Sequence, residues 1–174
     1  MTREKDKNMI SSTQVLRIAA GICLGLFAQL ATAADWQTYR APSYGFSMLI
    51  PTGVTPKEQE WPGGWGGITA EFEGVKVNGQ AKLGAAHTDA EIEKYSVGVI
   101  GVPAKSWRII DSGTNQNGWT RYRVFEAVRG SALFFGAYGV GKKGNYLLYM
   151  QTTAADYNAH QAEYRKWYDS IRVD

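Results

Sequence analysis

The sequence predicts an α+β domain in which an antiparallel sheet is covered on both of its faces. Apolar segments separated by short, turn-rich connections follow one another between Ser106 and Thr152, which is typical of an antiparallel meander. In Ala132–Val140 and Tyr146–Thr152, apolar residues occupy both the odd and the even positions. Each strand would therefore present apolar side chains to both faces of the sheet. The sheet therefore needs one layer above it and another below it.

The first 33 residues have the composition of a secretory signal peptide. Basic residues between positions 3 and 17 precede the apolar run Ile18–Leu30, and this run ends at the small residues Ala31-Thr32-Ala33. The run is well short of the ~20 residues that a membrane-spanning helix needs. We therefore expect cleavage after Ala33, which leaves residues 34–174 as a single domain without a membrane span, either periplasmic or secreted.

The composition of residues 34–174 argues against several classes of function. The only cysteine, Cys23, lies within the predicted signal peptide, so the exported chain has no disulfide, thiol nucleophile or thiolate metal site. Ile22 is bulky where lipid attachment to Cys23 would require a small residue, so we do not expect a lipoprotein. Basic residues outnumber acidic residues by only one after cleavage, and we therefore expect no nucleic-acid partner.

The first part of the domain is predicted to contain two hairpins separated by a loop. The turn 41–43 joins the first pair of strands, and Asn78-Gly79 is a typical hairpin turn for the second pair. Thr52–Gly67 is rich in glycine and proline and is predicted to be an exposed loop. The four strands expected here are Trp36–Arg40, Tyr44–Ile50, Ile68–Glu73 and Gln80–Ala86.

Two helices are predicted, one before the meander in the sequence and one after it. Thr88-Asp89-Ala90-Glu91 is a capping box, and the helix that it opens should end near Ser96 or Val97, before Gly98. The last helix should begin near Thr153 or Ala154 and cover one face of the sheet with its aromatic residues. The strands expected between the two helices are Ser106–Asp111, Trp119–Val128, Ala132–Val140 and Tyr146–Thr152.

The chain contains two histidines, His87 and His160, and their spacing does not predict a metal site. His87 is followed by the carboxylates of Asp89, Glu91 and Glu93, but Asp89 and Glu91 are also residues that favour the first turn of a helix. An envelope hydrolase that pairs His87 with a carboxylate therefore stays open as an alternative. We assign no catalytic residue, no metal ligand and no cofactor.

Trp61 and Trp65 are the candidate binding residues. Both lie in the predicted glycine-rich loop, and two indoles on such a loop cannot easily both belong to the core. Exposed aromatic side chains on loops commonly contact proteins, peptides or sugars. The alternative is that both rings fold back onto the sheet, and the sequence leaves the two interpretations open.

Two short motifs carry a family resemblance. Tyr44-Gly45-Phe46-Ser47 continues into an apolar strand that stops at Pro51, and Trp167-Tyr168-Asp169-Ser170-Ile171 lies near the end of the chain. With these motifs the sequence resembles the PsbP-like and Mog1-like group, close to bacterial periplasmic DcrB-type proteins. The resemblance implies an α/β/α sandwich around a twisted antiparallel sheet, with Gly45, Phe46 and Pro51 as residues of the fold. It also implies accessory and binding roles, and it supplies no catalytic residue.

The sequence thus favours an exported, non-enzymatic accessory or binding protein. Its partner would be a protein or another component of the cell envelope, recognised through surface contacts. A periplasmic immunity or inhibitor protein is a further alternative, because the size of the chain and its export permit that role.

Overall fold

The computed structural model describes residues 35–84 and 87–174, which belong to the compact unit Ala34–Asp174. The predicted signal peptide, its cleavage site after Ala33 and Cys23 lie outside the described residues. Within the described ranges, no helix combines the length and the apolar character that crossing a membrane demands.

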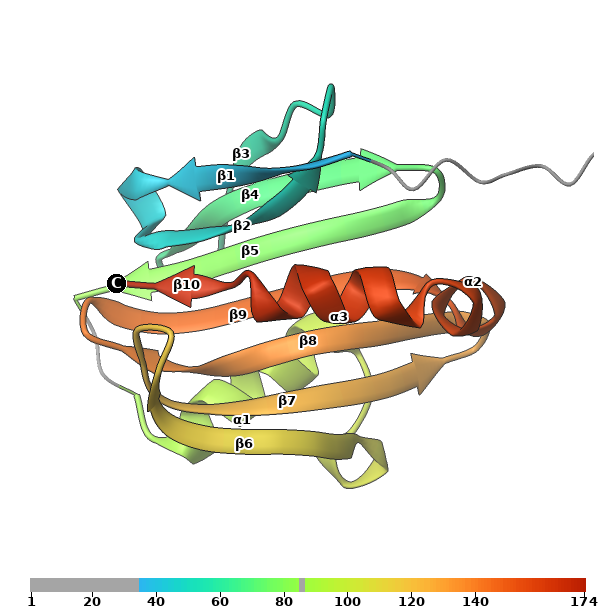
Figure 1. The fold of residues 1–174 in the computed structure, drawn as a ribbon. Helices are drawn as coiled ribbons and strands as arrows, with labels where there is room; N and C mark the ends of the chain where they lie inside the picture. Colours follow the sequence, from blue (N-terminus) through green and yellow to red (C-terminus); the bar gives the residue numbers. More distant parts are fainter. Residues whose placement is uncertain (1–34, 85–86) are drawn as a thin grey trace, which may run out of the picture. The chain divides into compact units, whose positions relative to one another are not determined.

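Two antiparallel sheets and a small number of helices make up this unit (Figure 1). The larger sheet has seven strands in the order β3-β4-β5-β9-β8-β7-β6, and the smaller sheet has three in the order β1-β2-β10. The strands are β1 (Trp36–Ala41), β2 (Phe46–Pro51), β3 (Lys57–Trp61), β4 (Trp65–Phe72), β5 (Val75–Leu83), β6 (Arg108–Gln116), β7 (Trp119–Arg129), β8 (Ala132–Gly141), β9 (Gly144–Thr153) and β10 (Arg172–Val173). The helices are α1 (Asp89–Ile100), α2 (Ala154–Ala159) and α3 (Gln161–Asp169), with 3-10 turns η1 (Pro42–Tyr44) and η2 (Ala104–Ser106).

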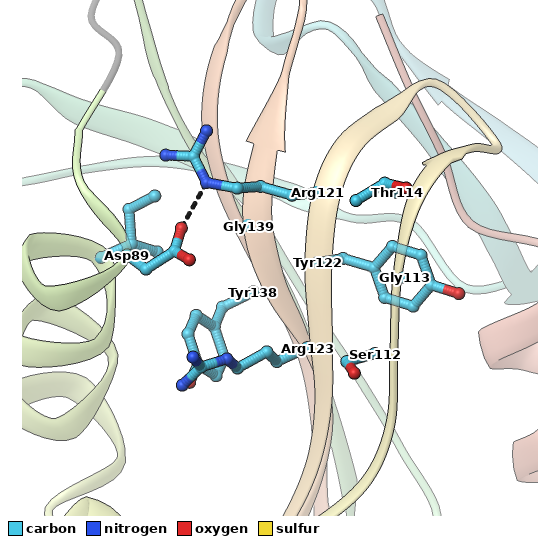
Figure 2. A pocket seen from close by; sticks show the side chains of 10 residues that line it. Asp89, Ser112, Gly113, Thr114, Arg121, Tyr122, Arg123, Tyr138 and Gly139 are labelled. Atoms are coloured by element: carbon cyan, nitrogen blue, oxygen red, sulfur yellow. Dashed lines mark hydrogen bonds and ion pairs between the residues drawn. The ribbon is translucent and has the colours of Figure 1, made fainter.

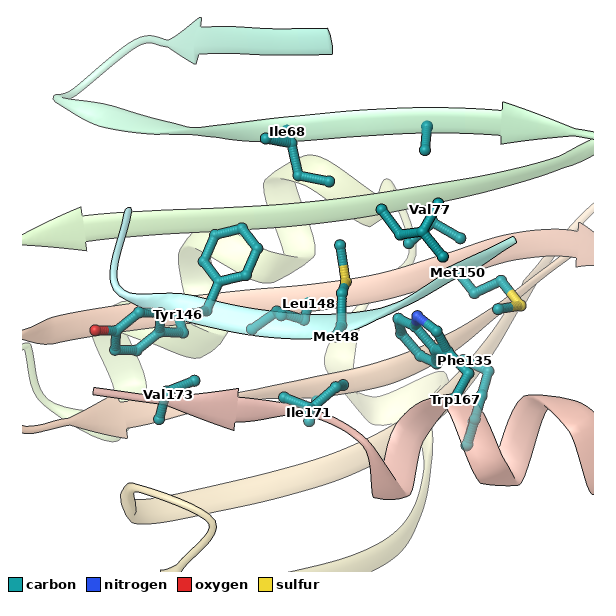
Figure 3. Close-up of a cluster of buried hydrophobic side chains, with 14 of the residues drawn as sticks. Met48, Ile68, Val77, Phe135, Tyr146, Leu148, Met150, Trp167, Ile171 and Val173 are labelled. Atoms are coloured by element: carbon teal, nitrogen blue, oxygen red, sulfur yellow. The ribbon is translucent and has the colours of Figure 1, made fainter. Parts of the chain in front are cut away.

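The seven-stranded sheet is packed on both faces, as the sequence predicts. On one face, α1 and the segment that follows it bury Ile92, Ile100 and Trp107 against the central strands. On the other face, Met48 of β2 and Trp167 of α3 belong to a second cluster of buried side chains (Figure 3). The predicted α+β fold with a layer on each side is therefore confirmed, and the three-stranded sheet shares one of those layers with α3.

The central strands β8 and β9 divide their side chains between the two clusters. Because side chains alternate along a strand, each strand supplies both faces. The cluster under α3 takes Leu133, Phe135, Leu148 and Met150. The cluster under α1 takes Phe134, Tyr138, Leu147 and Tyr149.

Helix α1 begins where the capping box predicts. The Glu91 N–H donates to Thr88 Oγ1 at 3.3 Å, and the Thr88 N–H donates to Glu91 Oε2 at 2.9 Å. The predicted end before Gly98 is wrong, because the helix continues to Ile100 and ends at Gly101, which has a φ of 71°. Ile100 is fully buried, so burial of one more apolar side chain outweighs the modest cost of a glycine inside the helix.

The predicted hairpin turn at Asn78-Gly79 is also wrong. Both residues lie inside β5, and the turn is formed by Glu73 and Gly74, whose φ values are 46° and 81°. A Cβ atom on Gly79 would lie 2.5 Å from the Phe46 ring, so glycine is needed there for the two sheets to pack together. The Asn-Gly pair therefore serves a close approach within a strand and not a reversal of the chain.

The predicted loop Thr52–Gly67 contains β3 and the beginning of β4, which form a hairpin in which Trp61 lies opposite Trp65. Gly66 and Gly67 lie in β4, and glycine is needed at both positions because the neighbouring atoms leave no room for a side chain. A Cβ on Gly67 would meet the Gly79 oxygen at 1.9 Å, and one on Gly66 would meet the Tyr44 ring at 2.8 Å.

The predicted last helix is interrupted at His160 and is followed by a short strand. Helices α2 and α3 flank His160, whose φ of −121° is not helical. Strand β10 then pairs with β2, with Val173 opposite Phe46. Strand β10 is thereby an edge strand of the small sheet, paired with the first residues of β2.

Candidate functional site

One cleft, with a volume of about 270 Å³, lies between α1 and strands β6, β7 and β8 (Figure 2). Arg121 and Arg123 of β7 reach from the sheet toward α1 in this view. Ser112 and Thr114 of β6 lie opposite these two arginines in the strand register, so they share the same face of the sheet.

The charges in the α1 cleft are paired with one another. Arg121 forms an ion pair with Asp89 and donates to the His87 carbonyl oxygen at 2.8 Å. Arg123 donates to Glu93 Oε2 at 3.0 Å. These contacts hold α1 against the sheet and leave the two guanidinium groups balanced by two carboxylates.

Tyr138 adds a further contact at the bottom of the α1 cleft. Its hydroxyl donates to Glu93 Oε2 at 2.9 Å. Burial, followed by the hydrogen bond to Glu93, raises the pKa of Tyr138 to about 12. The hydroxyl therefore stays protonated at neutral pH and acts as a hydrogen-bond donor.

A second cleft, which we call the aromatic cleft, is open to solvent at one end of the β3–β4 hairpin and has a volume of about 410 Å³. Its lining comes from η1 and from three neighbouring strands. The lining residues are Ser43, Tyr44, Glu60, Trp61, Gly64, Trp65, Gly66, Ala81 and Leu83.

Tyr44 is held in the aromatic cleft by two contacts. Its ring packs on the backbone of Gly66, where a Cβ would be only 2.8 Å away. Its hydroxyl donates to Glu58 Oε2 at 3.2 Å. Burial, then the hydrogen bond to Glu58, then the charges of Glu58 and Glu60 raise the pKa of Tyr44, so the phenol stays neutral.

The structure brings both predicted binding residues, Trp61 and Trp65, to the aromatic cleft, but in different environments. Trp65 is only 4% exposed, and its indole is stacked on the Tyr95 ring with a centroid distance of 3.7 Å and an interplanar angle of 5°. Trp61 is half-buried. Trp65 therefore supports the hairpin against α1, and Trp61 is the indole available to a ligand.

Sequence reasoning missed the other apolar parts of this site. Tyr44 was expected within a strand, and Leu83, which is 41% exposed, was not singled out. No signal in the sequence connects Leu83 or Tyr44 with the two tryptophans, because these residues come from separate segments. A binding role for Trp61 and Trp65 stays a prediction.

His87 and His160 lie in separate places and make local contacts. His87 Nδ1 is 3.9 Å from Glu91 Oε2, which is beyond hydrogen-bond distance, and Glu91 is engaged in the capping box. His160 Nδ1 lies 3.0 Å from Asp156 Oδ1, and Asp156 also accepts from Thr152 at 2.5 Å. Across the part of the chain that the structure describes, no three His, Cys, Asp or Glu side chains are grouped so that they could hold a metal ion.

Comparison with known proteins gives a structural match. No family model and no curated protein matches the chain. The solution structure of a cyanobacterial PsbP from Synechocystis sp. PCC 6803 matches with a TM-score of 0.56 and 11% sequence identity, over 87% of this chain and 99% of that chain. The fold is PsbP-like.

A second solved structure is more distant. It is a Pseudomonas aeruginosa protein of unknown function, with a TM-score of 0.33 and 13% identity over 76% of this chain and 92% of that chain. At the identity of the PsbP match, the likeness establishes the PsbP-like fold, and the closer resemblance to DcrB-type proteins stays a prediction.

Proposed function

We propose that this chain is an exported, non-enzymatic accessory protein, periplasmic or secreted, that binds a partner protein through the aromatic cleft. One observation carries the proposal: half-buried Tyr44, half-buried Trp61 and exposed Leu83 all line one open cleft of about 410 Å³. Large apolar side chains that meet at a surface are characteristic of interaction sites, and tryptophan and tyrosine are enriched among the residues that dominate binding.

The α1 cleft is the weaker candidate for this role. Its arginines already form ion pairs with Asp89 and Glu93, so a ligand would have to compete with contacts that the protein makes itself. In the part of the chain that the structure describes, no ion pair involves a residue that lines the aromatic cleft, and Trp61 is only half-buried. The PsbP-like fold is compatible with an accessory role, which the motifs at Tyr44 and Trp167 also imply.

Affinity capture with matched variants tests the proposal. The tagged protein is used to capture partners from an envelope extract, in parallel with Trp61→Ala and with Ile109→Ala as the control. Ile109 is 46% exposed and lies on β6, at the opposite edge of the sheet from β3. An aromatic anchor commonly contributes ~2 kcal/mol or more, which corresponds to about thirtyfold in affinity.

We expect the control to retain a partner that Trp61→Ala loses. Each variant is first shown by a denaturant melt to be folded, so that the loss reflects the surface and not unfolding. Capture that is equal for all three proteins would contradict the aromatic cleft as the binding site.

A further inference from the structure

Two carboxylates lie on the rim of the aromatic cleft. Glu58 and Glu60 lie opposite Ile68 and Gly66 in the β3–β4 register, so both project from the same face of the hairpin. Both residues are exposed, Glu60 lines the cleft, and Glu58 accepts the hydrogen bond from Tyr44. Two residues apart on a strand, they are separated by about 7 Å.

The basic residues near this rim do not neutralise those carboxylates. Lys57 lies opposite Thr69 and therefore projects from the other face of β3. Lys82 alternates with Ala81 and Leu83, so it also belongs to the other face, where its Cε approaches Gly64 at the hairpin turn. Trp61 alternates with Glu58 and Glu60 and therefore projects from that same other face. Lys143 approaches Gly45, but its Nζ is paired with Asp174 Oδ2 at 2.7 Å.

The side of the aromatic cleft that carries Tyr44 and Leu83 therefore combines a half-buried aromatic ring with an excess of negative charge. The direction of the Tyr44 pKa supports this, because after burial and the hydrogen bond to Glu58 the charges of Glu58 and Glu60 both raise it. A cation is attracted by the faces of tyrosine and tryptophan rings and also by carboxylates. An acidic partner would be repelled by the same two carboxylates.

We infer that the aromatic cleft binds a cationic side chain, arginine in the first place, presented by a basic segment of a partner protein. Arginine fits better than lysine because its planar guanidinium can stack on an aromatic ring while its N–H groups donate to a carboxylate. In this arrangement Tyr44 contacts the cation, and Glu58 and Glu60 balance its charge. This inference rests on the proposed function, since it names the chemistry of the partner at the same site.

Peptide titration tests the inference directly. The exported protein is titrated with the capped peptide Gly-Arg-Gly-Arg-Gly and followed by amide NMR, which shows both the affinity and the residues affected. Two matched peptides replace arginine with citrulline, which has the same shape without the charge, or with glutamate. We expect shifts at Tyr44, Glu60 and Leu83 with the arginine peptide, and binding at least fivefold weaker with each of the other two.

Isosteric variants then isolate the carboxylates. In Glu58→Gln with Glu60→Gln, the amide oxygen can still accept the Tyr44 hydroxyl, so the cleft keeps its shape and loses its charge. The control, Glu71→Gln with Glu73→Gln, makes the same change in net charge at the other end of the β4–β5 hairpin, where Glu71 pairs with Lys76 and Glu73 lies in the turn. An exposed ion pair typically changes affinity by up to about fivefold, so we expect about tenfold weaker binding for the first pair of changes and less than twofold for the control.

The outcomes separate this inference from the proposed function. Equal binding of the citrulline and arginine peptides, preference for the glutamate peptide, or shifts confined to other surfaces would overturn it. Partner capture that needs Trp61 but not the two carboxylates would also overturn it while leaving the proposed function in place. Binding of the arginine peptide that depends on Glu58 and Glu60 would support it even if capture did not require Trp61.

Discussion

Replacement of Trp65 should destabilise the protein far more than replacement of Trp61, although both residues line the aromatic cleft. Trp65 is 4% exposed and stacks on Tyr95, whose hydroxyl donates to Gln80 Oε1 at 2.7 Å. Removal of a buried tryptophan side chain typically costs ~3 to 5 kcal/mol, of which an aromatic pair accounts for ~0.5 to 1.5 kcal/mol. Trp61 is half-buried, so Trp61→Ala should cost about 1 kcal/mol.

Urea denaturation followed by circular dichroism measures the difference in free energy of unfolding, and a thermal melt measures the difference in Tm. For a domain of this size, 1 kcal/mol corresponds to roughly 3 °C in Tm, so Trp65→Ala should melt about 10 °C or more below the unchanged protein. Trp65→Phe keeps an aromatic ring over Tyr95 and should lose much less stability than Trp65→Ala. If the two alanine variants have free energies of unfolding within about 1 kcal/mol of each other, the packing role assigned to Trp65 is refuted.

Three further predictions concern the backbone, alkaline pH and processing. Gly79→Ala should destabilise the protein by ~1 to 3 kcal/mol because its Cβ would contact the Phe46 ring. Gly98→Ala, whose Cβ would meet nothing within 4 Å, should stabilise α1 by up to ~1 kcal/mol. Denaturant melts of the two variants measure both effects. Burial raises the pKa of a group of tyrosines to about 12, above their ordinary value of 10.0. The stability that they contribute is therefore present below pH 10 and is lost as the pH rises toward 12. Tyrosinate absorbance and circular dichroism should change together between these two pH values. These tyrosines are Tyr138, Tyr146, Tyr149 and Tyr157. N-terminal sequencing of the exported protein should begin at Ala34, and a lipid-bearing Cys23 at the terminus would contradict the signal-peptide prediction.

Features that depend on neighbouring residues were predictable from the sequence. The capping box at Thr88 forms as expected because its partners are one helical turn apart, and the meander from β6 to β9 follows from alternation and turn residues. The two covered faces of β8 and β9 were predictable for the same reason, since apolar side chains on both sides of a strand require packing on both sides.

Features that depend on distant residues were not predictable in this way. Asn78-Gly79 has the composition of a turn, and only the approach of Phe46 from the other sheet explains why it lies in a strand. The segment before Ile68 was predicted to be a loop because it is rich in glycine. In the structure Gly66 and Gly67 lie in β4, where the Tyr44 ring and the Gly79 carbonyl occupy the space that their side chains would need. In both cases glycine marks a close approach within a sheet.

The candidate site was found only in part from the sequence, because its residues are joined by packing. Trp61 was identified because it lies in a glycine-rich segment of the sequence. Tyr44 reaches the cleft from η1 and Leu83 from the end of β5, and neither was identified. No local pattern connects these three segments, and the same holds for the pairing of β10 with β2.

The segment Tyr44-Gly45-Phe46 links the fold to the aromatic cleft. Gly45 adopts a φ of 67°, which allows the chain to turn between η1 and β2. The turn sends neighbouring side chains to different places: Phe46 packs over Gly79 between the two sheets, and Tyr44 packs over Gly66 beside Glu58. Because glycine at positions 66 and 79 admits these rings, the close packing of the two sheets also fixes Tyr44 at the rim of the cleft. The motif that identified the fold in the sequence therefore also places one wall of the proposed binding site.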